Sequence, residues 1–144
     1  MAKPQTKELL NDLLVLSERF YELSVNVVNR VELFEAYLQQ MPGKVKCSVT
    51  SGTGDDFLEL SYIRDANNRA DKAWMLAFKT AAGEKPESVR QAPVIYRARL
   101  LSMMPQLLDV MLELQKKATA DMAKAVVEFD AWFGALKPPV NGNK

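Results

Sequence analysis

The segment SGTGDD, residues 51–56, combines two glycines with two aspartates, which could bind either a phosphate or a metal ion. A phosphate loop aims successive backbone N–H groups at one anion, usually from the start of a helix. The P-loop also needs Lys and then Ser or Thr after its glycines, whereas here two aspartates follow and would repel a phosphate. A metal site would need Glu59 as a further ligand, but Glu59 falls in a predicted strand. Since Gly52 and Gly54 both suit positive φ, we expect a turn between two strands.

A second polar segment, DANNRAD at residues 65–71, has the Asp65, Asn67 and Asp71 spacing of a calcium loop. Arg69 occupies a position that needs an acidic ligand, and the central glycine and terminal glutamate of such a loop are missing. We therefore expect a polar hairpin turn here as well.

The chain has no histidine and only one cysteine, Cys47. Catalytic triads built on histidine, intrachain disulfides and cysteine-ligated zinc sites are therefore excluded. Cys47 alternates with Val45 and Val49 on one strand face, which is typical of a small core residue. We predict no catalytic residue, cofactor or metal, and a protein that is not an enzyme.

Basic residues are concentrated in the middle of a chain whose formal net charge is only +1. Residues 44–99 hold ten Lys or Arg and seven Asp or Glu, for a local net charge of +3. A basic surface with an interleaved aromatic residue could follow a nucleic-acid backbone, and lysines on a sheet could equally block edge pairing. The candidate nucleic-acid contacts are Lys44, Lys46, Arg64, Arg69, Lys79, Arg97 and Arg99.

Polar residues interrupt the first long helical pattern at Asn26, Asn29 and Arg30. They could form a polar notch beside Pro105 if two long helices pack antiparallel. Alternatively, Arg30 could pack its stem against the helix and extend its guanidinium to water.

The apolar period identifies the elements that must position these residues. From about 6 to 41, apolar residues recur at steps of three and four without Gly or Pro, which predicts one long helix ending at Pro42 and Gly43. Three segments between about 44 and 80 alternate with period two, which predicts a three-stranded antiparallel meander, although the third, AWMLAFKTAA, could also be helical. A second helical pattern covers about 89–136 and is expected to kink at Pro105; the alternative is that Ser102 caps a new helix with Pro105 in its first turn.

The expected fold is therefore α+β and mostly helical, with two long antiparallel helices flanking the meander. We expect a single domain over residues 1–137 and a flexible tail over 138–144.

The apolar stripe of the second helix is wider than one partner helix can cover. Its second line recurs every seven residues at Leu100, Leu107 and Leu114, and two aromatics follow near the C-terminal end. We expect these positions to form a protein interface, most simply in a twofold dimer: Leu100, Leu107, Leu114, Trp132 and Phe133.

The sequence thus indicates a non-catalytic scaffold or adaptor that acts as an oligomer or in a larger assembly. The alternative is a small nucleic-acid-associated subunit that uses the basic middle segment. The N-terminus MAKPQTKELL lacks the apolar run of a signal peptide, and no segment is apolar over about 18 residues. We therefore expect a cytoplasmic protein without a membrane partner.

Overall fold

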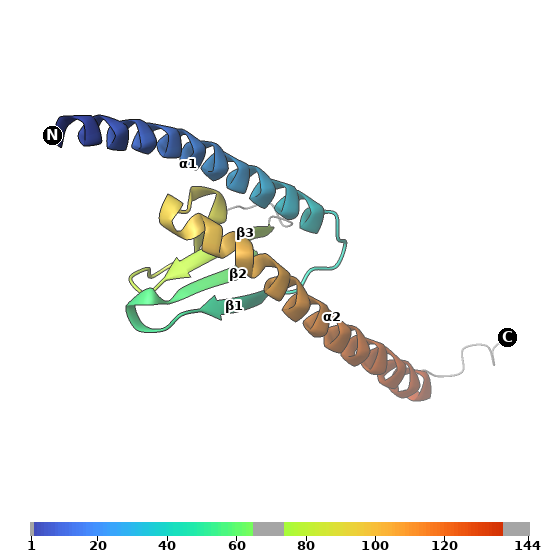
Figure 1. The fold of residues 1–144 in the computed structure, drawn as a ribbon. Helices are drawn as coiled ribbons and strands as arrows, with labels where there is room; N and C mark the ends of the chain where they lie inside the picture. The colour runs from blue at the N-terminus through green and yellow to red at the C-terminus, as the bar shows by residue number, and fades with distance from the viewer. Residues whose placement is uncertain (1, 65–73, 137–144) are drawn as a thin grey trace.

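The computed structural model describes residues 2–64 and 74–136, which form two long helices and one antiparallel sheet (Figure 1). In chain order the elements are helix α1 (Ala2–Gln39), strands β1 (Cys47–Ser51), β2 (Leu58–Arg64), β3 (Trp74–Thr80) and β4 (Glu87–Ser88), and helix α2 (Val94–Leu136). Short 3-10 helices, Gly54–Asp56 and Val89–Gln91, precede β2 and α2. The predicted mostly helical α+β class is confirmed.

The sheet is a meander in the order β1-β2-β3-β4, with every neighbouring pair antiparallel. The third predicted strand is a strand and not a helix, with Leu60 opposite Phe78 and Tyr62 opposite Leu76. The sheet has four strands instead of three because the two residues of β4 pair with Ala77 and Phe78. The segment DANNRAD and the predicted tail lie outside the described residues.

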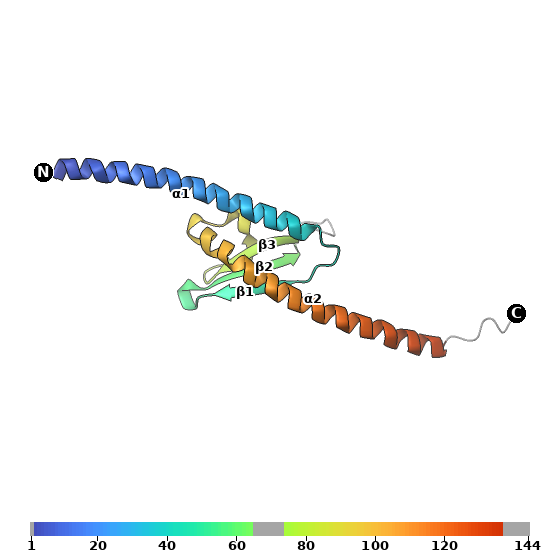
Figure 2. The same cartoon turned by 45° about the vertical axis from the view of Figure 1, so that its right-hand side comes forward.

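The two helices run in the same general direction, so the predicted antiparallel orientation is wrong (Figures 1 and 2). Arg97, near the start of α2, donates a hydrogen bond to the Ser24 hydroxyl of α1. Gln115, further along α2, donates one to the carbonyl of Gly43, just beyond α1. The physical reason is parity. The chain reverses at the connections from α1 to β1, from β1 to β2, from β2 to β3 and from β3 to α2, and this even number of reversals returns α2 to the direction of α1.

The core lies between the inner face of the sheet and parts of both helices. The first half of α2 packs on the sheet, and the second half of α1 packs beside this part of α2 (Figure 2). The fully buried large side chains come from all these elements: Leu38, Leu58, Leu60, Tyr62, Leu76, Leu100 and Leu107. The opposite face of the sheet is covered by neither helix.

Helix α2 continues through Pro105 from Val94 to Leu136. Ser102 does not cap a new helix, because its hydroxyl donates to the carbonyl of Arg99 at 2.7 Å. Pro105 is exposed and has no N–H to donate to the carbonyl of Leu101, so the helix loses one backbone hydrogen bond without ending there.

Each helix leaves about half of its length unpacked. Every residue of 5–23, here called the α1 arm, is exposed. No residue of 116–136, the α2 arm, is buried, and Ala118 alone is half-buried. The two arms leave the central body on opposite sides (Figures 1 and 2). In the described residues, neither helix has an apolar stretch that could cross a membrane.

Candidate functional site

The glycine-rich segment is a structural turn that is held by an arginine of α2. Gly52 and Gly54 have φ values of 76° and 58°, which glycine adopts readily. Arg99 donates from Nε to the Ser51 hydroxyl at 3.1 Å and from Nη2 to the Ser51 carbonyl at 2.7 Å. Its Nη1 lies 2.9 Å from Oδ1 of Asp56. The acidic end of the turn therefore binds a cation of the same chain, as expected for a turn and unlike a phosphate loop.

The candidate nucleic-acid contacts are not brought together on one surface. Arg99 holds the turn, and Arg97 donates to the Ser24 hydroxyl and to the Ala92 carbonyl. Lys44 donates to the carbonyl of Met41 at the end of α1. Lys46 and Lys79 lie on the uncovered face of the sheet, Arg64 lies at the end of β2, and Arg69 is outside the described residues.

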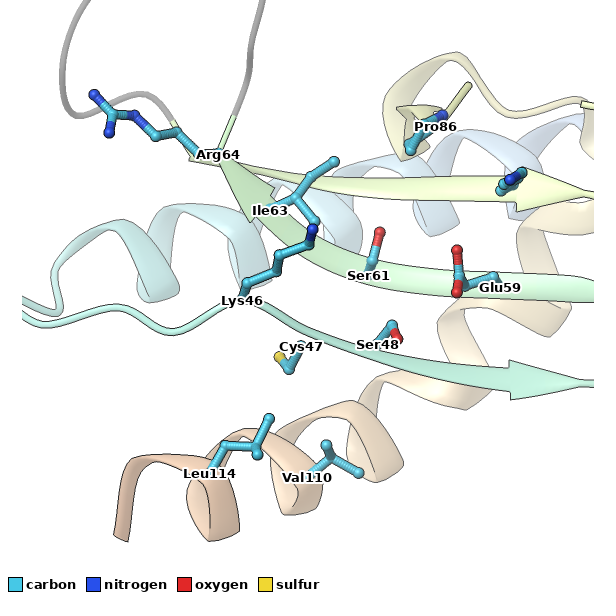
Figure 3. A pocket seen from close by; sticks show the side chains of 11 residues that line it. Lys46, Cys47, Ser48, Glu59, Ser61, Ile63, Arg64, Pro86, Val110 and Leu114 are labelled. Carbon is cyan, nitrogen blue, oxygen red and sulfur yellow. The ribbon is translucent and has the colours of Figure 1, made fainter. Parts of the chain in front are cut away.

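Lys46, Arg64 and Lys79 line a hollow of about 640 Å³ that wraps around the edge strand β1 (Figure 3). Val110 and Leu114 of α2 lie on one side of β1, and residues of β2 lie on the other. The full lining is Lys46, Cys47, Ser48, Glu59, Ser61, Ile63, Arg64, Lys79, Pro86, Val110 and Leu114. Glu59 offsets one of the three positive charges of this lining.

The hollow also lacks an activated nucleophile. Burial raises the pKa of the Cys47 thiol, although a backbone hydrogen bond from Tyr62 opposes this shift. A thiol with a raised pKa stays protonated near neutral pH and reacts poorly. Cys47 is buried at 5% exposure among core residues, as the sequence predicted. In residues 2–64 and 74–136, no group of three acidic, cysteine or histidine side chains could hold a metal ion.

The predicted polar notch does not form. Asn26, Asn29 and Arg30 are all exposed, and Arg30 donates to the carbonyl of Asn26 in its own helix at 3.2 Å. These residues lie outside the packed stripe of α1 at Val27, Val31 and Leu38. Asn26 lines a hollow with Arg19, Tyr21, Glu22 and Val25 of the same helix, and neither Asn29 nor Arg30 belongs to its lining.

The structure contains a buried carboxylate that the sequence analysis missed. Glu35 is only 5% exposed and accepts the backbone N–H of Leu76 at 2.7 Å. Arg90 donates to the other oxygen of Glu35 from Nε and from Nη2, each at 2.8 Å. Because β4 pairs only with Ala77 and Phe78, α1 supplies the next partner along the edge of β3. Glu35 therefore attaches α1 to the sheet, which is a structural role.

The predicted protein interface divides between the core and the surface. Leu100 and Leu107 are 0% exposed and pack against the sheet within the same chain, so their assignment to an intermolecular interface is corrected. The meander extends further under α2 than the sequence suggested, and it buries Leu100, Met104, Leu107 and Met111 but leaves Leu108 41% exposed. Leu114, Trp132 and Phe133 are 39%, 58% and 47% exposed.

Most of the exposed apolar surface lies on the two arms. The large apolar residues exposed on the α1 arm are Leu9, Leu10, Leu13, Leu14, Val15, Leu16, Phe20, Tyr21 and Leu23. Those on the α2 arm are Met122, Val126, Val127, Phe129, Trp132, Phe133 and Leu136. Phe129, Trp132 and Phe133 form an aromatic cluster in which Phe129 and Phe133 stack with centroids 5.4 Å apart.

The α1 arm was not predicted as an interface, although its residue spacing was visible in the sequence. The spacing alone does not show which half of a long helix the sheet will cover. Comparison of the chain with protein-family models, curated proteins and solved structures gave no match.

Proposed function

We propose that this protein is a non-catalytic scaffold or adaptor that assembles with other protein chains through its two helical arms. The observation that carries the proposal is the exposure of sixteen large apolar side chains on the two arms, in which no described residue is buried. Soluble monomers rarely expose contiguous apolar patches larger than a few hundred Å². A helix of about 20 residues is also marginally stable in water unless its apolar face is packed.

The internal contacts favour this proposal over a nucleic-acid role. Of the candidate basic residues, Arg97 and Arg99 are already bonded within the chain, where they hold α1 and the β1–β2 turn. Lys46 and Lys79 share the hollow with Glu59. The absence of histidine from the sequence and the burial of Cys47 support the non-catalytic part of the proposal.

The test is the molecular mass in solution, measured by light scattering on a size-exclusion column. We expect the wild-type protein to elute as an oligomer of the 16.2 kDa chain. Leu16→Glu places a charge on the apolar stripe of the α1 arm and should shift the mass towards that of the monomer. Val15→Glu is a matched control, because both residues are 65% exposed and Val15 lies off the stripe.

The corresponding pair on the α2 arm is Phe129→Glu, on its stripe, and Val127→Glu, on the opposite side. A wild-type protein that remains monomeric at high concentration, with no effect of any of the four substitutions, would contradict self-assembly through the arms.

A further inference from the structure

The apolar stripes of both arms continue the faces that the central body buries. On α1, the steps of three and four join exposed Leu9, Leu13, Leu16, Phe20 and Leu23 to half-buried Val27 and buried Val31. On α2, the same steps run from buried Leu107 and Met111 through exposed Leu114 to six further positions: Ala118, Met122, Ala125, Phe129, Trp132 and Leu136. The two helices therefore present coiled-coil seams of equal length, with six positions each from residues 9–27 and 118–136. Val27, the last position of the α1 seam, lies just beyond the α1 arm and also packs against the core.

We propose that the α1 arm of one copy pairs antiparallel with the α2 arm of a second copy, and that the reciprocal pair forms at the other end of a twofold dimer. The inference rests on the proposed function and identifies its partner as a second copy of this chain. One symmetric contact would then cover both arms at once, because the arms leave the body on opposite sides (Figures 1 and 2).

A single register aligns every seam position of the two arms. Seam positions alternate along each helix between two kinds, called a and d. Each layer of an antiparallel coiled coil pairs an a position of one helix with a d position of the other. In this register the layers are Val27–Ala118, Leu23–Met122, Phe20–Ala125, Leu16–Phe129, Leu13–Trp132 and Leu9–Leu136. The only aromatic residue on the α1 seam thus meets an alanine, and the large rings of the α2 seam meet leucines. The seams are complementary in size as well as in spacing.

The same register is complementary in charge and polarity at the flanks. It places Arg19 opposite Glu128 and Asn26 opposite Asp121 on one flank, and Leu10 opposite Phe133 on the other. No two like charges face each other across the flanks of the paired α1 and α2 seams. About 24 residues of each copy would lie in the two seams and their flanks, which is within the 20–30 residues a side of a stable protein interface.

The alternative self-pairings are less complementary. Antiparallel pairing of two α2 arms through the same seam would place Glu128 opposite Glu128 and leave both α1 arms uncovered. Antiparallel pairing of two α1 helices through the seam of residues 9–27 would bring together segments that each carry a net charge of −2 over residues 5–23, and would place Arg19 opposite Arg19.

Disulfide cross-linking tests the pairing directly. Cys47 is the only native cysteine, so the experiment uses a full-length Cys47→Ala background. Phe20→Cys and Ala125→Cys replace one predicted layer, and mild oxidation of the double variant should give a covalent dimer on a non-reducing gel. A 1:1 mixture of the two single variants should cross-link only between unlike chains. The control pair, Val15→Cys with Val127→Cys, lies off both seams and should not cross-link.

Each other outcome has a defined meaning. A ladder of covalent multimers would replace the closed dimer with a head-to-tail chain and overturn the twofold arrangement. Cross-links between like chains would overturn the choice of partner arm. An oligomer by light scattering that never cross-links would overturn this pairing and leave the proposed function intact, whereas a monomer would overturn both.

A charge exchange tests the register without disturbing the seam. Arg19→Glu and Glu128→Arg should each raise the dimer dissociation constant about tenfold, because each of the two symmetric sites then opposes like charges. The double variant Arg19→Glu/Glu128→Arg restores opposite charges and should recover wild-type affinity. Losses that simply add in the double variant would overturn the register.

Discussion

At the scale of single residues, the β1–β2 turn allows two glycines to be compared under different constraints. Both have positive φ, but a Cβ on Gly52 would lie 2.4 Å from the Asp56 carbonyl oxygen and 2.5 Å from Nη2 of Arg99. A Cβ on Gly54 would meet nothing within 4 Å. We expect Gly54→Ala to cost about 1 kcal/mol of stability through φ alone, and Gly52→Ala to cost at least about 1 kcal/mol more through the clash. Urea denaturation measures both, and equal losses would mean that the Asp56 carbonyl and Arg99 do not crowd Gly52.

A second prediction at this scale concerns Tyr62, which is 1% exposed. Its hydroxyl is the one buried side-chain polar atom in the described residues without a hydrogen-bond partner. Burial, reinforced by the nearby charges of Glu35 and Cys47, raises the pKa of Tyr62 from 10.0 to about 12. Because the raised pKa belongs to the folded state, its contribution to stability is complete below pH 10 and is lost as pH rises towards 12.

The loss of unfolding free energy between pH 10 and 12 should reach about 2–3 kcal/mol and disappear in Tyr62→Phe. The measurement is urea denaturation across this range. The Cys47 thiol also has a raised pKa, so the comparison should be made in a Cys47→Ala background. At neutral pH, Tyr62→Phe should be neutral or slightly stabilising, since it removes an unpaired buried hydroxyl. A phenylalanine variant that loses stability as steeply as its parent would exclude Tyr62 as the source.

At the scale of elements, the attachment of α1 to the sheet depends on Glu35. Glu35→Ala would leave the Leu76 N–H and the Arg90 guanidinium without their acceptor, and should cost about 1–3 kcal/mol of unfolding free energy. Glu32→Ala is the matched control, because Glu32 lies 3.9 Å from the same arginine and its side chain is 48% exposed. Its loss should be below about 0.5 kcal/mol in the same urea titration. Similar losses for both variants would mean that the buried carboxylate is not what attaches α1.

At the scale of the whole molecule, the described chain is a compact centre with an apolar arm on each side. The centre explains why the chain folds, because the inner face of the sheet and the adjacent halves of both helices bury a continuous core. The arms are the part that the proposed assembly would cover, because their seams have the period of a packed helix and their large apolar side chains are exposed in the described residues. The predicted change of mass in Leu16→Glu and its absence in Val15→Glu belong to this scale, since only assembly distinguishes two equally exposed neighbours.

The sequence by itself determined the features that depend on local order. The change of apolar period from helix to strand and back predicted both helices and the first three strands, because each element buries one of its own faces. The glycines of residues 51–56 predicted the turn, and the alternation around Cys47 predicted its burial. Even the absence of the predicted notch follows from helical geometry, because Asn26, Asn29 and Arg30 lie off the apolar stripe.

Only the tertiary structure decided how these elements meet. The relative direction of α1 and α2 depends on the number of reversals between them, and the partner of Glu35 depends on how short β4 is. The extent of the sheet decided that Leu100 and Leu107 are buried while Trp132 and Phe133 are exposed. A periodic stripe shows that a helix face is to be buried, but the segment that buries it, within the chain or on another copy, is set by contacts between residues far apart in the sequence.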